Sequence, residues 1–285
     1  MIIDFHTHTF PEKIAARAIA KLEQAARFRA FTDGTLNGLA KSMEAGKVDH
    51  SVVVPVVTDP RQTDSINEFA AALNEKTAET GILSFGGVHP EDGRYKDSLR
   101  HIRDLGLPGI KLHPDYQGAF FDDPAYLHIV DYACELGLVI VVHAGVDIGL
   151  PEPVHCTPQM ARSLIDQVRP EKLILAHMGG WKLWSDVERL IVGQNVYLDT
   201  SFSLGELDRS AFYGKPTPKE PLMGPEQFRR ILAHHGADRI LFATDSPWGG
   251  QKESIAYLRS LALPEDTLEK ILGGNALQLL PFLKK

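Results

Sequence analysis

The feature that most constrains the fold is an alternation of short apolar, β-branched runs with longer amphipathic stretches along the whole chain. Helical spacing is found at residues 65–80, 123–136, 158–168 and 225–235. The intervening apolar runs are apolar on both faces, which is typical of parallel strands in a sheet that is buried on each side. The expected strands are residues 2–6, 51–57, 82–88, 109–113, 139–143, 173–177, 196–199 and 240–245.

Eight strand–helix repeats over 285 residues close most naturally into a (β/α)₈ TIM barrel. An open doubly wound sheet is the alternative fold, but it would place a glycine-rich turn after the first strand. Residues 7–11, Thr-His-Thr-Phe-Pro, contain no glycine. Because no linker or low-complexity segment interrupts the pattern, we expect a single domain over residues 1–285.

Polar residues end several of the expected strands, and in a barrel those ends meet at the C-terminal face, where active sites form. Asp4, His6 and His8 are spaced two residues apart, so an extended chain should project all three to one side. Imidazole and carboxylate groups are ligand types of Zn²⁺. The predicted metal ligands are His6, His8, His143 and Asp245, with His177 beside them as a further ligand or as the group that polarises a substrate carbonyl.

A metal-bound water would have a pKa near neutrality and become a nucleophile, and Asp245 is placed to accept its proton. Lys111 shares a strand face with His113 and should also enter the site. Two roles are open for this lysine: it binds a substrate carboxylate, or it is carbamylated and bridges two metals. We favour one Zn²⁺ per chain and an uncarbamylated Lys111. The residues expected to bind substrate are His113, His155 and Trp248.

The charge of the chain argues against a nucleic-acid partner. Acidic residues outnumber basic ones by 37 to 30, and no cluster of lysine and arginine resembles a phosphate-binding patch. The apolar run at residues 139–142 is too short to cross a bilayer. Two cysteines do not form a disulfide framework. We therefore expect a cytoplasmic protein with a small-molecule substrate and no membrane partner. Whether the chain forms a homo-oligomer is left open by the sequence.

Several motifs, in order along the chain, resemble those of the amidohydrolase superfamily, in particular its amidohydrolase-related branch, amidohydrolase 2. The resemblance implies a metal-dependent (β/α)₈ barrel with His6, His8, His143 and Asp245 around the metal and His177 beside it. It leaves the reaction open, since this branch contains hydrolases, lactonases and non-oxidative decarboxylases. The matching segments are residues 4–8, 109–114, 142–143, 176–180, 243–247 and 274–280.

The residues that follow two candidate ligands favour hydrolysis. Decarboxylases of this branch commonly have His-Pro after the fifth strand and a glycine-rich run directly after the histidine of the sixth. Here residues 143–145 are His-Ala-Gly and residues 177–180 are His-Met-Gly-Gly. We expect a hydrolase that uses a metal-activated water to attack an amide, ester or lactone of a small anionic substrate. The alternative is a non-oxidative decarboxylase of an aromatic or unsaturated carboxylic acid. A non-catalytic barrel is disfavoured by the intact ligand set.

Overall fold

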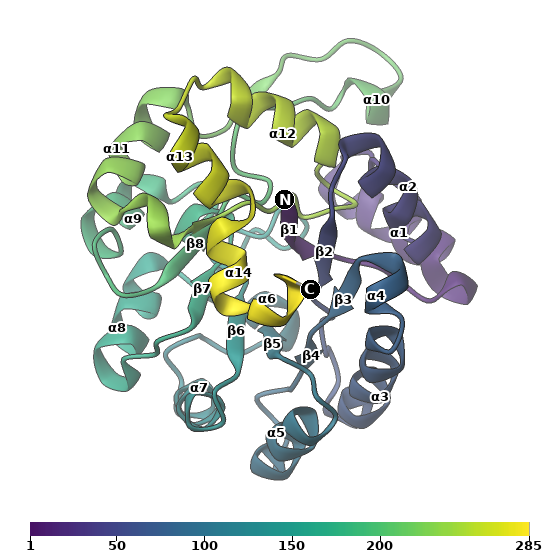
Figure 1. Cartoon of the computed structure of the whole chain (residues 1–285), viewed down its shortest axis with the longest axis vertical. Helices are drawn as coiled ribbons and strands as arrows, with labels where there is room; N and C mark the ends of the chain where they lie inside the picture. The colour runs from purple at the N-terminus through teal and green to yellow at the C-terminus, as the bar shows by residue number, and fades with distance from the viewer. Residues whose placement is uncertain (285) are drawn as a thin grey trace.

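The computed structural model describes residues 1–284 as a ring of parallel strands surrounded by helices (Figure 1). Every expected strand is present, and the (β/α)₈ barrel is confirmed. The expected strand at residues 82–88 is divided into two short pieces. The barrel strands are β1 (Ile3–Thr7), β2 (His50–Val53), β3 (Ile82–Ser84), β4 (Gly86–Gly87), β5 (Gly109–Leu112), β6 (Val139–Val142), β7 (Leu173–Leu175), β8 (Tyr197–Asp199) and β11 (Ile240–Leu241).

The strands form two parallel sheets whose edges join to close the ring. One has the order β1-β2-β3 and the other the order β11-β8-β7-β6-β5-β4. The amide of Phe5 donates to the carbonyl of Phe242 at 3.0 Å, and the amide of Asp245 donates to the carbonyl of His6 at 2.8 Å. These bonds join the first strand to the last. They also bring the first and last polar strand ends together.

Helices alternate with the barrel strands, and a small antiparallel pair, β9 (Glu206–Leu207) and β10 (Glu220–Pro221), lies in the long segment after β8. The expected helices at residues 158–168 and 225–235 match α8 and α11, whereas the one at 65–80 is divided into α3 and α4. The helices are α1 (Glu12–Ala26), α2 (Leu36–Gly46), α3 (Thr63–Asn74), α4 (Thr77–Thr80), α5 (Tyr95–Asp104), α6 (Pro114–Gln117), α7 (Pro124–Glu135), α8 (Pro158–Val168), α9 (Trp184–Leu190), α10 (Ser210–Tyr213), α11 (Pro225–His235), α12 (Gln251–Ser260), α13 (Glu265–Glu269) and α14 (Asn275–Leu279).

The segment between β1 and β2 holds two helices, α1 and α2, which are separated by residues 27–35. Asp33 accepts hydrogen bonds from both the amide and the hydroxyl of Thr35. The Thr35 hydroxyl oxygen in turn accepts from the amide of Gly38 at 2.9 Å, which caps α2. The side-chain hydrogen bonds of Asp33 and Thr35 therefore fix the turn before α2 and the start of that helix.

The barrel interior is an apolar core that is closed at its N-terminal end. Ile3, Phe5 and residues of other strands form one buried cluster with Leu280 and Leu283 of the C-terminal segment. Gly273 lies against the carbonyl of Met1, at the start of β1, so this segment covers the N-terminal ends of the strands. Figure 1 shows α14 across the centre of the ring, beside both termini. A polar site is thereby confined to the opposite end. Within residues 1–284, no helix combines the length and apolar character needed to span a membrane.

Strand β1 does not keep a strict alternation of side chains. Its pairing with β2 shifts register between Asp4 and Thr7. Phe5 packs in the barrel interior and His6 points into the site, while Asp4 accepts hydrogen bonds from Thr244 and from Gln251 of α12. The expectation that Asp4 shares a face with His6 and His8 is wrong, because a bulge-like irregularity turns consecutive residues to the same side.

Candidate active site

The ends of β1 and of the segment after β11 bring three donor atoms together. The Nε2 atoms of His6 and His8 are 3.1 Å apart. Asp245 places Oδ1 3.1 Å from Nε2 of His8 and 3.5 Å from Nε2 of His6. One nitrogen or oxygen from each of the three residues lies within 4.8 Å of the others, which is close enough for a single metal ion to contact all three.

Two further histidines extend this cluster from β6 and β7. Nε2 of His177 lies 2.9 Å from Nδ1 of His143, and the rings of His6 and His177 have centroids 5.5 Å apart. The structure thus brings all five residues predicted as metal ligands to one place at the C-terminal face of the barrel. The donor atoms of His6, His8 and Asp245 lie within 4.8 Å of one another, whereas Nδ1 of His143 faces Nε2 of His177.

Groups behind the cluster orient the imidazoles. Nδ1 of His6 lies 2.9 Å from Oδ2 of Asp199, and Nδ1 of His177 lies 3.0 Å from the carbonyl oxygen of Ser201. Each Nδ1 must donate to its oxygen acceptor, so each Nε2 carries a lone pair that faces the site. Oδ1 of Asp199 also accepts hydrogen bonds from the backbone amides of His177 and Ser201, at 2.9 and 3.1 Å. Asp199 thus bonds to backbone amides and also contacts the ring of His6.

Burial favours the neutral form of His6 and His143, which is the form that binds a metal. Desolvation, followed by the positive charge of Lys111, holds the pKa of His6 well below its usual value. Desolvation and the neighbouring His113 do the same to the pKa of His143. For Asp245, burial acts to raise the pKa, but the hydrogen bond to His8 and the nearby His6 outweigh it and lower the pKa overall. Neutral imidazoles at His6 and His143 and an ionised carboxylate at Asp245 are the protonation states that a divalent cation needs.

Replacing Asp199 with alanine should weaken metal binding without removing a ligand. Without its acceptor, His6 loses both its fixed ring orientation and its preferred tautomer, and we expect metal affinity to fall by roughly 10- to 100-fold. Competition with a chromophoric chelator measures the affinity directly. Asp97→Ala, an exposed carboxylate on α5, is the matched control. An Asp199→Ala protein that is folded and binds metal as tightly as the control would contradict this role.

Lys111 lies among the ligands rather than on a cavity wall. Its Nζ is 3.0 Å from Nε2 of His6, and the residue is only 1% exposed. Burial lowers its pKa to about 8, although Asp245 and Asp199 oppose that shift. The expectation that this amine faces substrate therefore has no cavity contact to support it.

A second group of possible ligands consists of His113, His143 and Asp147, with donor atoms also within 4.8 Å. The rings of His113 and His143 are stacked, 4.2 Å apart at an interplanar angle of 10°. Imidazole lone pairs lie in the ring plane, so two parallel stacked rings do not aim at one ion. Oδ1 of Asp147 instead accepts hydrogen bonds from the backbone amides of Gly149 and Leu150. Its Oδ2 lies 3.5 Å from Nε2 of His113. This group does not fit a second metal.

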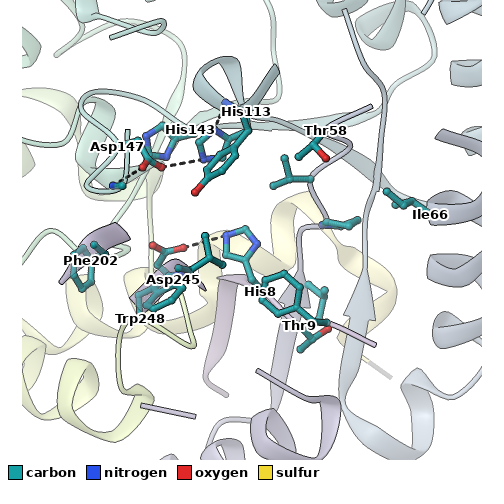
Figure 2. Close-up of a pocket in the computed structure, with 18 of the residues that line it drawn as sticks. His8, Thr9, Thr58, Ile66, His113, His143, Asp147, Phe202, Asp245 and Trp248 are labelled. Atoms are coloured by element: carbon teal, nitrogen blue, oxygen red, sulfur yellow. Dashed lines mark hydrogen bonds and ion pairs between the residues drawn. The ribbon is translucent and has the colours of Figure 1, made fainter. Parts of the chain in front are cut away.

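A cavity of about 650 Å³ leads from the ligand cluster toward α1 and α3. Figure 2 shows His8 and Asp245 facing His113, His143 and Asp147 across its inner end. Of the residues expected to bind substrate, His113 and Trp248 line this cavity. His155 does not; its Nδ1 lies 3.1 Å from Oδ1 of Asp115. Asp147 and Tyr116 also line the cavity and were missed, because neither a single loop residue nor a single residue of the short helix α6 forms a sequence pattern of its own.

This closed (β/α)₈ barrel carries its histidine and carboxylate cluster at the C-terminal face, where enzymes of this fold have their active sites. The chain belongs to the amidohydrolase family (amidohydrolase 2), whose model matches residues 3–282. The resemblance inferred from the motifs is therefore confirmed.

Individual relatives of this chain are decarboxylases. It is 26% identical, over 199 residues, to 2-amino-3-carboxymuconate-6-semialdehyde decarboxylase of Dictyostelium discoideum, an alignment that covers 64% of this chain and 55% of the relative. Its fold is similar to that of 2,6-dihydroxybenzoate decarboxylase from Rhizobium, with a TM-score of 0.69, 17% identity and coverage of 99% and 98% of the two chains. A 5-carboxyvanillate decarboxylase from Novosphingobium aromaticivorans, solved with manganese and 4-hydroxy-3-methoxy-5-nitrobenzoic acid, gives a TM-score of 0.70, 15% identity and coverage of 99% and 96%.

These comparisons overturn the expected hydrolase. The relatives are decarboxylases, which corresponds to the alternative reaction. The preference for hydrolysis was wrong. It was based on two local differences from decarboxylases: alanine instead of proline follows His143, and a methionine separates His177 from the glycines. Those positions are neighbours of the ligands, and the ligands are compatible with either reaction.

Proposed function

We propose that this protein is a metal-dependent decarboxylase that releases CO₂ from an aromatic or unsaturated carboxylic acid. The observation that carries the proposal is the convergence of His6, His8, His143, His177 and Asp245 at the inner end of a large cavity. The similarity to decarboxylases supports it. In the proposed reaction a C–C bond breaks, CO₂ leaves, and the carbon that keeps the electron pair takes up a proton, so no oxidant is required.

The ligand set fits one divalent cation, and we propose Zn²⁺, because imidazole nitrogens with one carboxylate suit that ion. When bound, the ion would supply a positive charge that holds the acidic substrate and stabilises the charge developing in the transition state. Asp199 orients His6 for this task, and the Ser201 carbonyl orients His177. Lys111 stays uncarbamylated in this proposal, since the stacked pair of His113 and His143 leaves one metal position.

The proton that replaces CO₂ must reach the substrate carbon from a group on the cavity wall. Asp245 lines the cavity, its side chain is 13% exposed, and it contacts His8 at 3.1 Å. We propose that Asp245 takes up a proton originating in solvent and delivers it to the carbon. His113, which is held beside Asp147, lies on the opposite wall and positions the substrate ring.

Metal analysis of the purified protein is the first test. We expect about one Zn²⁺ per chain without added ions, measured by elemental analysis. His6→Ala and His143→Ala should each lose most of the bound metal, since each removes a side chain that would coordinate the ion directly. His234→Ala, an exposed residue of α11, should keep the wild-type content. Well under one metal per chain, with no recovery on adding Zn²⁺ or Mn²⁺, would contradict the site.

The reaction itself is tested by product analysis. Incubating the metal-loaded protein with hydroxybenzoic acids should release CO₂ and the corresponding phenol, detected by coupled assay and chromatography. His177→Ala should lower this rate strongly while His128→Ala, on α7, leaves it unchanged, because helix surfaces lie away from the barrel mouth. Release of an amine or alcohol from amides, esters or lactones, with no CO₂ from any acid, would exclude the decarboxylase proposal.

A further inference from the structure

The cavity is much larger than the ligand cluster and changes character along its length. Its histidine and aspartate side chains gather at the inner end, around His8 and Asp245. Toward the outside it is bounded by apolar side chains from α1 and α3. Figure 2 shows Ile66 of α3 across the cavity from Phe202, with His8 and Asp245 between them. The outer wall includes Ile14 and Leu22 of α1 and Ile66, Phe69 and Leu73 of α3.

The size and rim of the cavity fit a ligand with an extended apolar body. Its volume of about 650 Å³ lies within the range of about 300–1,000 Å³ that is usual for drug-sized ligands. Ile14 and Phe69 line it and yet are 43% and 52% exposed, so apolar surface continues to the entrance. A single-ring acid held at the ligand cluster would leave this outer part unfilled.

Charge further restricts the ligand. Among residues 1–284, no lysine or arginine lines the cavity. The polar groups of its wall on the α3 side are the uncharged Thr58, Gln62 and Ser65. Lys111 is covered beneath His6. A second carboxylate on the substrate would lose its hydration without meeting a cation, which is unfavourable. At the inner end it would also meet the carboxylates of Asp147 and Asp245.

On the basis of the proposed decarboxylation, we propose that the substrate has a single carboxylate, held at the ligand cluster, and an extended apolar alkyl or aryl body that lies between α1 and α3. The apolar wall then supplies affinity through burial, and the ligand cluster supplies orientation. Acids that carry a second carboxylate remote from the reacting one are disfavoured.

A ligand series tests this substrate class by binding, independently of turnover. The probes are 2-hydroxybenzoates with 4-alkyl chains from methyl to hexyl, and 2-hydroxyterephthalate as the diacid matched to the 4-methyl compound. Calorimetry with the metal-loaded protein should give dissociation constants that fall about three- to fourfold for each added methylene. The diacid should bind at least about tenfold more weakly than its methyl counterpart. Equal affinities along the series, or tighter binding of the diacid, would overturn the proposal.

Variants of α3 locate the effect in the cavity. Phe69→Ser should weaken hexyl binding and leave methyl binding unchanged, because only the longer chain reaches the rim. Ile66→Arg should weaken hexyl binding and strengthen diacid binding by adding a cation to the wall. Phe282→Ser, at a similarly exposed phenylalanine in the C-terminal segment, is the matched control and should change neither. If Phe69→Ser, like Phe282→Ser, still binds longer alkyl chains more tightly to the same degree as wild type, the chain does not contact Phe69. The assignment of the alkyl chain to the wall at α3 would then be overturned.

The two proposals fail separately in this design. Tighter binding of longer chains with no CO₂ release would support the substrate class and exclude decarboxylation of these acids. CO₂ release that is equally efficient for all chain lengths and for the diacid would support the reaction and exclude the substrate class.

Discussion

Asp245→Asn will lower kcat for CO₂ release by about 10²- to 10⁴-fold, the range associated with loss of a positioned proton donor or acceptor. An asparagine keeps the shape of the side chain and one oxygen, but it cannot carry a proton between solvent and the substrate carbon. It also lacks the negative charge that faces the Nε2 atoms of His6 and His8, at 3.5 and 3.1 Å. Turnover is measured as CO₂ released under saturating substrate.

Metal content and binding must be measured on the same Asp245→Asn preparation, because Asp245 is both a predicted ligand and the proposed proton carrier. If the variant is loaded with metal and binds substrate normally but does not turn over, proton delivery is the lost step. Rate loss that disappears when metal is restored by excess Zn²⁺ would show that Asp245 acts only as a ligand. The exposed Asp104→Asn, on α5, controls for the loss of one negative charge.

The barrel could be predicted from the sequence because its signal is local and repeated. Each strand is a short apolar run, and runs such as residues 139–142 are buried on both faces regardless of what they pair with. The division of the strand at residues 82–88 was not predictable in this way. There the amide of Phe85 bonds to the carbonyl of Val53, a contact between segments that are distant in sequence.

The site could be predicted as far as strand ends determine it. His6, His143, His177 and Asp245 lie at the ends of apolar strands, and barrel closure alone brings such ends together. His8 was predicted from its two-residue spacing to His6. The exact roles depend on contacts that no local pattern encodes. Asp199 holds His6 from 193 positions away in the chain, and Lys111 contacts His6 from 105 positions away. The apolar outer wall was also missed, because its residues are ordinary amphipathic helix positions of α1 and α3 until the helices are placed.

Asp4→Ala should be the most destabilising single change at the polar end of β1. Asp4 is fully buried, and its carboxylate accepts hydrogen bonds from the amide of Thr244 at 3.0 Å, the hydroxyl of Thr244 at 2.5 Å and Nε2 of Gln251 at 2.8 Å. Alanine leaves these buried donors without their acceptor. It also removes the side-chain contacts that join β1 to the segment after β11. Since each buried polar group left unpaired costs about 1–3 kcal/mol, we expect a total loss of about 3 kcal/mol or more.

Urea denaturation of wild type and variant, followed by circular dichroism, measures this change in the free energy of unfolding. Asp4→Asn should lose less than Asp4→Ala, because the amide oxygen still accepts from the backbone of Thr244. Asp97→Ala, on the exposed face of α5, should stay within about 0.5 kcal/mol of wild type. A loss below about 1 kcal/mol for Asp4→Ala would mean that β1 is held to the closing segment by the backbone bonds of Phe5 and Asp245 alone. The carboxylate of Asp4 would then have no part in closing the barrel beneath the predicted metal ligands.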